Sequence, residues 1–113
     1  MNILILGSGI VGANLAKKLS EQGKNVFLLD DDANELKNLS ERYDIKTIYD
    51  DPLNPSFYKN FDIKIDYFIA VTRSDEKNII TSKFAKEFLN VDKTIARVRN
   101  QNLILEENKS LLI

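Results

Sequence analysis

Three glycines lie close together near the start of the chain, directly after the short apolar run at residues 3–6. After a strand, Gly7 permits a tight turn, Gly9 lets the backbone approach a pyrophosphate, and Gly12 lets the following helix pack closely on the sheet. Phosphate oxygens can then accept hydrogen bonds from the N–H groups at the start of that helix, where its dipole favours negative charge. Three glycines can also mark only a tight strand–helix turn, so a nucleotide site needs a second feature.

That second feature is an acidic residue at the end of the next apolar run. Asp30 follows residues 26–29 and lies about 20 residues after the glycines, where dinucleotide-binding folds place the carboxylate that accepts the ribose hydroxyls. A 2′-phosphate beside Asp30, Asp31 and Asp32 would be repelled, and no arginine follows directly to bind it. NAD or an adenosine nucleotide therefore fits better than NADP. We expect Asp31 and Asp32 themselves to cap the next helix.

The remaining sequence alternates short apolar runs with amphipathic stretches, the pattern of a parallel α/β sheet. We predict a Rossmann-like, doubly wound α/β fold with strand order 3-2-1-4-5 and helices on both faces. The predicted strands are residues 3–6, 26–29, 46–49, 67–71 and 94–98. The long helix predicted at residues 75–89 has five apolar side chains that we expect to face inward, namely Ile79, Ile80, Phe84, Phe88 and Leu89.

The topology of that sheet brings a second group of polar residues towards the glycine loop. Strands one and four are neighbours whose connections run to opposite faces, and ligands bind in the crevice beyond their carboxyl ends. Thr72 and Arg73 follow the fourth strand and are therefore expected across the crevice from the glycines. The stretch that continues through Ser74 and Asp75 also fits ordinary helix capping. The position of Thr72 and Arg73 in the topology favours contact with a ligand.

The composition restricts the class of protein. A length of 113 residues fits one domain with its own core. The chain has 16 Lys and Arg residues against 17 Asp and Glu residues, so it lacks the excess of positive charge that is typical of nucleic-acid-binding proteins. The absence of cysteine fits a reducing cytoplasm and excludes a thiolate metal site, and the absence of histidine removes the commonest general base. No apolar run reaches about 18 residues and no signal-peptide pattern is present, so we expect no direct membrane insertion.

A longer set of motifs resembles one known family. The phrases VTRSDEKN at residues 71–78 and IARVRN at residues 95–100 lie in frame with the glycine loop. Together they are similar to the N-terminal nucleotide-binding domain of Trk-type potassium-uptake regulators, the TrkA-N or RCK/KTN domains, over most of residues 1–100. The resemblance implies a domain that binds NAD(H), or alternatively ATP or ADP, and does no chemistry. It implies a nucleotide site made of Gly7, Ser8, Gly9, Ile10, Val11, Gly12, Asp30, Thr72, Arg73 and Arg97.

The resemblance also implies partners. In that family, ligand occupancy alters the geometry of a dimer or ring of such domains bound to a membrane potassium transporter or channel. This chain would accordingly be a cytoplasmic regulatory subunit or domain, a homodimer or higher homo-oligomer, held at the inner face of the cell membrane by its partner. The family's Gly-x-Gly-like turn after the third strand is replaced here by residues 50–52, which read Asp-Asp-Pro, and we assign no contact to them. The family's companion C-terminal domain is absent, and we expect residues 101–113 to be a C-terminal linker or a partner-docking segment.

Two other functions compete with this interpretation. An NAD-dependent dehydrogenase, or the nucleotide-binding fragment of one, needs a proton donor or acceptor beside the nicotinamide and a second element that holds substrate. The chain has no histidine, and Tyr49, Tyr58 and Tyr67 fit packing better than catalysis. We therefore predict that the protein is not an enzyme and has no catalytic residue. A protein–protein adaptor with a vestigial glycine loop is the third alternative.

Overall fold

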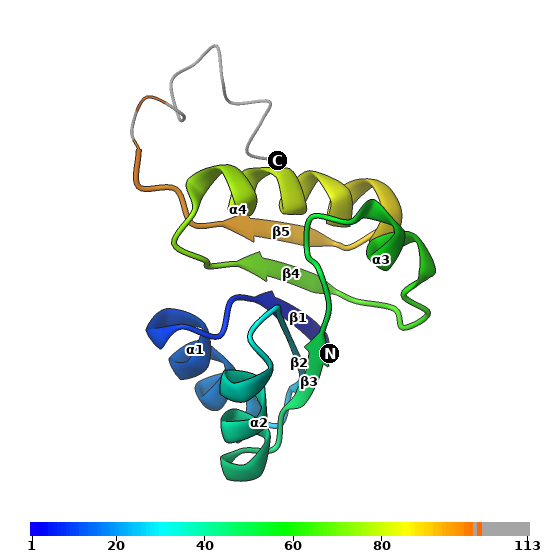
Figure 1. The fold of residues 1–113 in the computed structure, drawn as a ribbon. Helices are drawn as coiled ribbons and strands as arrows, with labels where there is room; N and C mark the ends of the chain where they lie inside the picture. The colour runs from blue at the N-terminus through cyan, green and yellow to red at the C-terminus, as the bar shows by residue number, and fades with distance from the viewer. Residues whose placement is uncertain (101, 103–113) are drawn as a thin grey trace.

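The computed structural model describes residues 1–100 and 102, and in this part of the chain it has one parallel sheet with helices on both faces (Figure 1). The five strands have the order β3-β2-β1-β4-β5, and every neighbouring pair is parallel. The predicted fold class and strand order are therefore confirmed. The elements are β1 (Asn2–Leu6), α1 (Ile10–Glu21), β2 (Asn25–Asp30), α2 (Ala33–Arg42), β3 (Lys46–Tyr49), α3 (Pro55–Asn60), β4 (Tyr67–Ala70), α4 (Asp75–Phe84), the π-helix η1 (Ala85–Leu89) and β5 (Lys93–Ala96).

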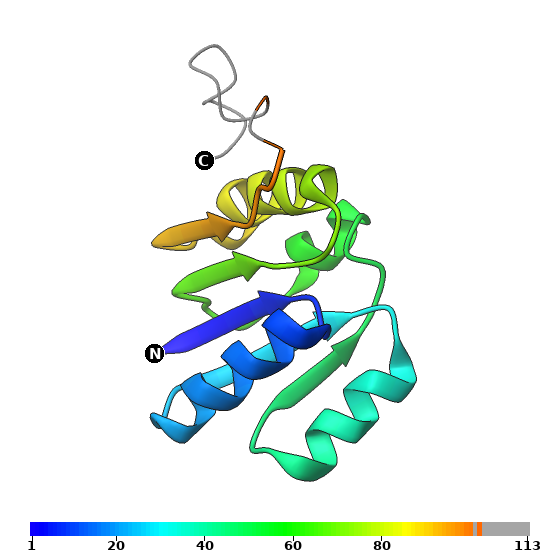
Figure 2. The same ribbon diagram turned by 90° about the vertical axis from the view of Figure 1, so that its left-hand side faces the viewer.

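The sheet has a separate apolar core on each face. Figures 1 and 2 show α1 and α2 on one face and α3 and α4 on the other. Because side chains alternate along a strand, Leu4 and Leu6 of β1 join the core beneath α3, α4 and η1, while Ile3 and Ile5 join the core beneath α1 and α2. A central parallel strand must be apolar on both faces, which explains why the first residues of the chain form an almost unbroken aliphatic run.

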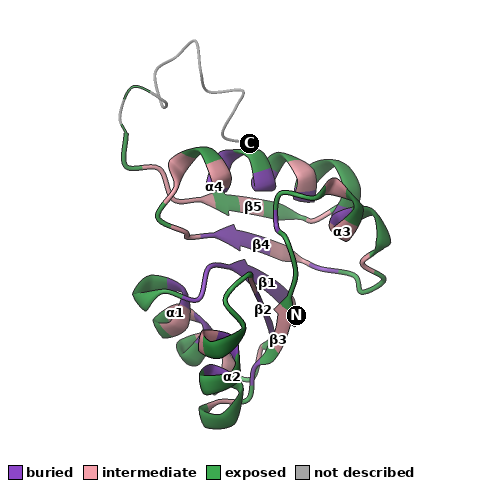
Figure 3. Cartoon of the chain, in the orientation of Figure 1, coloured by how far each residue is buried: buried purple, intermediate pink, exposed green. Residues whose placement is uncertain are grey.

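Burial is greatest at the centre of the sheet. In Figure 3, β1 and most of β4 are coloured as buried, and the side chains of Leu4 and Phe68 are fully enclosed. These two residues lie side by side in the β1–β4 register. The neighbouring strands β1 and β4, where the two halves of the sheet meet, are therefore well buried. They hold the starting points of the loops that follow them.

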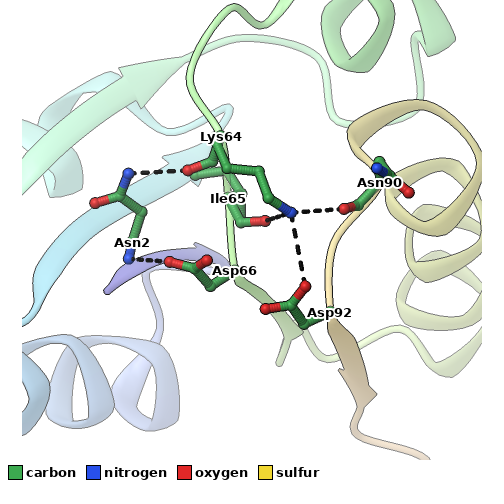
Figure 4. A network of polar contacts seen from close by, with 6 residues as sticks. All are labelled: Asn2, Lys64, Ile65, Asp66, Asn90 and Asp92. Atoms are coloured by element: carbon green, nitrogen blue, oxygen red, sulfur yellow. Dashed lines mark hydrogen bonds and ion pairs between the residues drawn. The ribbon is translucent and has the colours of Figure 1, made fainter.

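A polar network joins the amino ends of β1, β4 and β5 (Figure 4). The amide of Asn2 donates to Asp66 Oδ2 at 2.7 Å, and Lys64 Nζ donates to the carbonyl oxygen of Asn90 at 2.7 Å. Lys64 also lies 3.7 Å from Asp92, but both side chains are exposed, so this ion pair contributes about 1 kcal/mol at most. The network holds together the amino ends of the strands. Ligands bind at the other side of such folds, beyond the carboxyl ends of the strands.

The buried stripe of α4 differs from the predicted one. Its buried residues include the polar side chains of Asn78, Thr81 and Ser82. Ile80 and Phe88, both predicted to face inward, are 44% and 37% exposed, so that part of the prediction is wrong. Ile80 lies about 100° around the helix from each of its two neighbours in sequence, which are both buried, and so it falls on the side opposite to the buried face. The turn that contains Phe88 is π-helical, which changes the register of the last side chains.

Two boundary predictions also need correction. The fifth strand was expected at residues 94–98 but spans Lys93–Ala96, because the carbonyl oxygen of the next residue accepts a hydrogen bond from the side chain of Asn78 rather than from a strand. Both Asp31 and Asp32 were expected to cap α2. Asp32 is its N-cap and accepts from the amide of Glu35, whereas Asp31 donates its amide to Asp30.

Ser82 provides a test of this packing. Its hydroxyl oxygen is buried and has no hydrogen-bond partner among the described residues. Replacing it in Ser82→Ala removes an unpaired polar group and raises helix propensity, so the free energy of unfolding should rise by about 1–2 kcal/mol. Urea denaturation followed by circular dichroism measures this. Thr81→Ala is the matched control, because its hydroxyl donates to the carbonyl oxygen of Lys77 at 2.7 Å; that variant should be destabilised. A loss of stability in Ser82→Ala would contradict the packing described.

Candidate functional site

A pocket of about 940 Å³ opens at the carboxyl ends of the strands. Its walls come from the loops that follow β1, β2, β4 and β5, together with the facing sides of α1 and α2. Since β1 and β4 are neighbours with helices on opposite faces, the pocket lies at the point where the direction of winding changes. Nine of the ten predicted site residues line it: Gly7, Ser8, Gly9, Ile10, Val11, Asp30, Thr72, Arg73 and Arg97.

The three glycines have three different environments. Gly7 has φ of +115°, and an added Cβ would lie 3.1 Å from the carbonyl carbon of Val71, so both conformation and space require glycine. A Cβ on Gly9 would meet nothing within 4 Å, because this residue faces the open pocket. Gly12 is the one predicted residue outside the pocket lining. A Cβ there would overlap the carbonyl oxygen of Gly7, so the close approach is to the loop itself and not only to the sheet.

The first turn of α1 is uncapped. Among the described α-helices, α2, α3 and α4 each have an N-cap side chain that accepts from a first-turn amide: Asp32, Asn54 and Ser74. The N-cap of α1 is Gly9, which has no side chain to do this. The first turn also contains no acidic residue to balance the helix dipole. The amide end of α1 therefore faces the pocket with its partial positive charge available to an anion.

Asp30 ends β2 and is held against the glycine loop. Its Oδ2 accepts from the amide and the hydroxyl of Ser8, at 2.6 and 2.7 Å. Its Oδ1 accepts from the amides of Asp31 and Asp32, at 2.7 and 3.1 Å. Two carboxylate oxygens offer about four acceptor positions, so these four donors occupy all of them. A ribose hydroxyl can bind Asp30 only where one of these donors gives way, and the rotatable Ser8 hydroxyl is the one that can.

The pKa of Asp30 is lowered from its ordinary value. Partial burial of the carboxyl acts in the opposite direction, but the hydrogen bonds from Ser8 and from Asp31 outweigh it. Asp30 is therefore ionised at neutral pH. Its contribution to stability is present above the unfolded-state pKa near 3.8 and is lost as the pH falls through the lower folded-state value.

The opposite wall comes from the loop after β4 and the segment after β5. Thr72 Oγ1 donates to Asn78 Oδ1 at 2.7 Å and accepts from the amide of Ser74 at 3.1 Å, so its hydroxyl serves mainly to shape this loop. Arg73 is exposed and lines the pocket, and Arg97 is half-buried beside it. The structure thus brings both predicted arginines to the side of the pocket that faces Asp30.

Three lining cations were not predicted. Arg42 lies in the last turn of α2. Lys77 lies in the first turns of α4, and Arg99 follows Arg97 by two residues. In extended backbone, residues two apart point to the same side, and this spacing could have identified Arg99 from the sequence. Lys77 and Arg99 complete a basic wall at the β4–β5 side of the pocket, which consists of Arg73, Lys77, Arg97 and Arg99. The β2–α2 side is mainly acidic: it carries Asp30, Asp31, Asp32 and Glu35 together with one cation, Arg42.

Other kinds of site were sought in the described part of the chain. Its Asp and Glu residues form no group of three or more that could hold a metal ion. None of its helices has the length and apolar character needed to cross a bilayer. The loop at residues 50–52, to which no contact was assigned, is not among the pocket-lining segments.

A family model for the TrkA-N domain matches residues 3–108. The chain belongs to the TrkA-N domain family. This confirms the resemblance drawn from its motifs. The Trk system potassium uptake protein TrkA of Haemophilus influenzae is 32% identical over 110 residues, which cover 96% of this chain and 24% of that protein. The chain spans between 22% and 50% of the length of the curated relatives it matches.

Solved structures share the fold of this TrkA-N domain. The NAD(P)-binding domain of an exopolyphosphatase-related protein from Archaeoglobus fulgidus superposes with a TM-score of 0.83 at 24% identity, covering 96% of this chain and 80% of that one. UDP-glucose 4-epimerase from Bifidobacterium longum, solved with NAD+ and UDP, gives 0.71 at 16% identity and covers 91% of this chain and 38% of that one. At these identities the likeness is one of fold.

The Ser8–Asp30 contact of this TrkA-N domain can be tested without a ligand. Ser8→Ala removes one of the two donors from Asp30 Oδ2, so the pKa of Asp30 should rise relative to the wild type. An NMR titration of the carboxyl carbon measures this. The stability difference between variant and wild type should be present at neutral pH and should shrink as the pH falls below about 3.8, where Asp30 loses its charge. An unchanged titration would show that the hydroxyl does not bind Asp30.

Proposed function

We propose that this TrkA-N domain is a regulatory, non-catalytic module that binds NAD(H) and belongs to a potassium-uptake system. The observation that carries the proposal is the uncapped amide end of α1, which opens into the pocket beside Asp30. A pyrophosphate over Gly9 would accept hydrogen bonds from the first-turn amides and would meet no side chain at that position. The pocket volume lies within the range of small-molecule sites.

Asp30 is the proposed ribose acceptor. The Ser8 hydroxyl donates to Asp30 Oδ2, and a ribose hydroxyl would take over that position. Exchange of one hydroxyl donor for another keeps the carboxylate satisfied, so the substitution has a small net cost. The three neighbouring carboxylates, Asp30 to Asp32, would repel a 2′-phosphate, which favours NAD(H) over NADP(H). ATP and ADP remain alternative ligands, because they carry the same adenosine and an equivalent diphosphate.

The main competing function is that of an NAD-dependent dehydrogenase or a fragment of one. The solved neighbours support a nucleotide-binding fold but do not distinguish an enzyme from a sensor. We favour the sensor because the relatives with the stronger sequence match are named as Trk potassium uptake proteins. No histidine is present to act as a general base. Turnover of NADH with any added substrate would overturn this part of the proposal.

The proposed partner is a membrane potassium transporter or channel, which would hold the protein at the inner face of the cell membrane. We further propose that the domain works as a homodimer or a larger homo-oligomer. A ligand held by the loops after β1 and β4 joins the two halves of the sheet. It can change an adjacent interface only by its difference in affinity for the two arrangements of that interface.

We also propose that residues 101–113 are a linker or a docking segment. All of these residues except residue 102 lie outside the described part of the chain.

Gly9 provides the first test of this function. Gly9→Val fills the space where the pyrophosphate is proposed to lie, so calorimetry should detect no binding of NAD, NADH, ADP or ATP. An added Cβ at this position meets no protein atom within 4 Å, so far-UV circular dichroism should match that of the wild type. Gly9→Ala is the graded control and should retain weakened binding. Wild-type affinity in Gly9→Val would contradict the assigned role of the loop.

Asp30 provides the second test. Asp30→Ala should weaken NAD binding by about 1–3 kcal/mol, the range for losing the partner of a buried polar group, and should reduce the preference for NAD over NADP. Asp31→Ala is the matched control, since it removes the same charge from a neighbouring position without removing a Ser8 contact. That control should bind NAD at least as well as the wild type. If Asp30→Ala and Asp31→Ala had the same affinity for NAD as each other, and likewise for NADP, then Asp30 does not bind the ribose.

A further inference from the structure

Residues 97–100 have two roles in the structure. They carry the chain away from the sheet after β5, and they also form part of the pocket wall, since Arg97 and Arg99 line it. The amide of Arg97 still donates to the carbonyl oxygen of Ala70 at 2.9 Å, but in the described part of the chain β5 ends one residue earlier. Contacts with the start of α4 therefore determine where this segment lies.

Asn78 makes the first of these contacts. Its side chain is fully buried. Oδ1 accepts from the amide and the hydroxyl of Thr72 at 2.9 and 2.7 Å, and Nδ2 donates to the carbonyl oxygens of Thr72 and Arg97 at 3.1 and 2.9 Å. All four hydrogen-bonding positions of the amide are used. One side chain thus joins the loop after β4 to the first residue of the segment.

Asp75 makes the second contact, at the first position of α4. Its Oδ1 accepts from the amide of Arg99 at 3.0 Å, and its Oδ2 accepts from the amide of Asn100 at 2.7 Å. The pKa of Asp75 is lowered, first by the bond from Arg99 and then by that from Asn100. The guanidinium of Arg99 in turn donates to the carbonyl oxygen of Arg73 at 2.7 Å. Residues 97–100 are therefore attached at both ends to the β4–α4 connection (residues 71–78).

We propose that Asp75 is a positioning residue of the nucleotide site: it holds Arg99 and Asn100 so that Arg99, beside Arg97, faces the ligand phosphates. The inference rests on the proposed function. The four cations of the basic wall come from two segments, with Arg73 and Lys77 on the β4–α4 connection and the other two on residues 97–100. A diphosphate attracted to both segments strengthens their association, and by reciprocity a fixed segment strengthens diphosphate binding. Phosphate occupancy is thereby coupled to the chain that leaves the domain.

The sign of one mutational effect separates positioning from simple electrostatics. Asp75 is an anion near a site for anions, so removal of its charge alone should tighten the binding of a diphosphate. Removal of its two hydrogen bonds releases the amides of Arg99 and Asn100, and ordering these residues again when the ligand binds costs free energy. Positioning therefore predicts weaker binding of ADP in Asp75→Ala. Adenosine has no phosphate, so its binding should not change.

The experiment is calorimetry of ADP and adenosine with the 113-residue chain and three variants. Asp75→Ala should bind ADP about tenfold more weakly, which corresponds to about 1.4 kcal/mol. Asp75→Asn, which keeps an oxygen acceptor, should recover part of that loss. The matched control is Glu76→Ala, because Glu76 is an exposed carboxylate on the same helical turn that does not line the pocket. It should bind both ligands as the wild type does.

NMR hydrogen exchange provides a second readout in the same samples. ADP should slow exchange of the Arg99 and Asn100 amides in the wild type, adenosine should not, and Asp75→Ala should abolish the effect. Unchanged or tighter ADP binding in Asp75→Ala would overturn the inference, as would an equal loss of ADP and adenosine binding, which indicates a general structural defect. If the wild type bound neither of these ligands nor NAD, the proposed function would fail and the inference with it. Binding of NAD without binding of ADP would overturn the inference alone. Normal wild-type binding with an unaffected variant would overturn the inference alone.

Discussion

The backbone contact between Gly7 and Gly12 determines how the first helix starts. The chain leaves β1 through a residue with positive φ, and the helix returns so closely that the Gly7 carbonyl lies where any Cβ on Gly12 would be. Because α1 begins at Ile10 in this position, its amide end points into the pocket and not along the sheet. Because the N-cap residue is Gly9, no side chain caps this helix, so an anion can satisfy amides that a serine or aspartate would satisfy elsewhere.

Asp30 links the second strand to this same loop. Its carboxylate accepts from main-chain and hydroxyl donors of the protein itself, so the charge is stabilised without a ligand. This side of the pocket can therefore be ordered before a nucleotide binds. A ligand that binds Asp30 exchanges a hydrogen bond within the protein for one to the ligand. The gain in binding free energy is therefore smaller than the new contact alone would indicate.

The two ends of the strands have different roles: contacts at the amino ends stabilise the sheet, and the loops at the carboxyl ends form the pocket. At the amino edge, Asn2, Lys64 and Asp66 join neighbouring strands through short polar contacts (Figure 4). At the carboxyl edge, the loops meet around a pocket with charges of opposite sign on its two walls. This polarity suits a ligand with hydroxyl donors at one end and phosphates towards the other. Membership of the TrkA-N family is consistent with that arrangement, and the basic wall depends on a segment that the glycine pattern does not reveal.

The sequence determined what depends on local pattern. The glycine spacing, the apolar runs and Asp30 were sufficient for the strand order and for the parts of the pocket lining in the glycine loop, at Asp30 and at Thr72 and Arg73, because parallel strands place their carboxyl ends at one side of the sheet. Only the tertiary structure decided the features that depend on partners distant in the chain. The buried face of α4 is partly polar, and hydrophobic periodicity misplaced Ile80 and Phe88 there because it could not register that Asn78 is satisfied by Thr72 and Arg97. Ser8 and Asp75 likewise acquire their roles from residues more than 20 positions away. A hydrogen bond between distant residues leaves no periodic trace in the sequence, so the fold alone brings its donor and acceptor together.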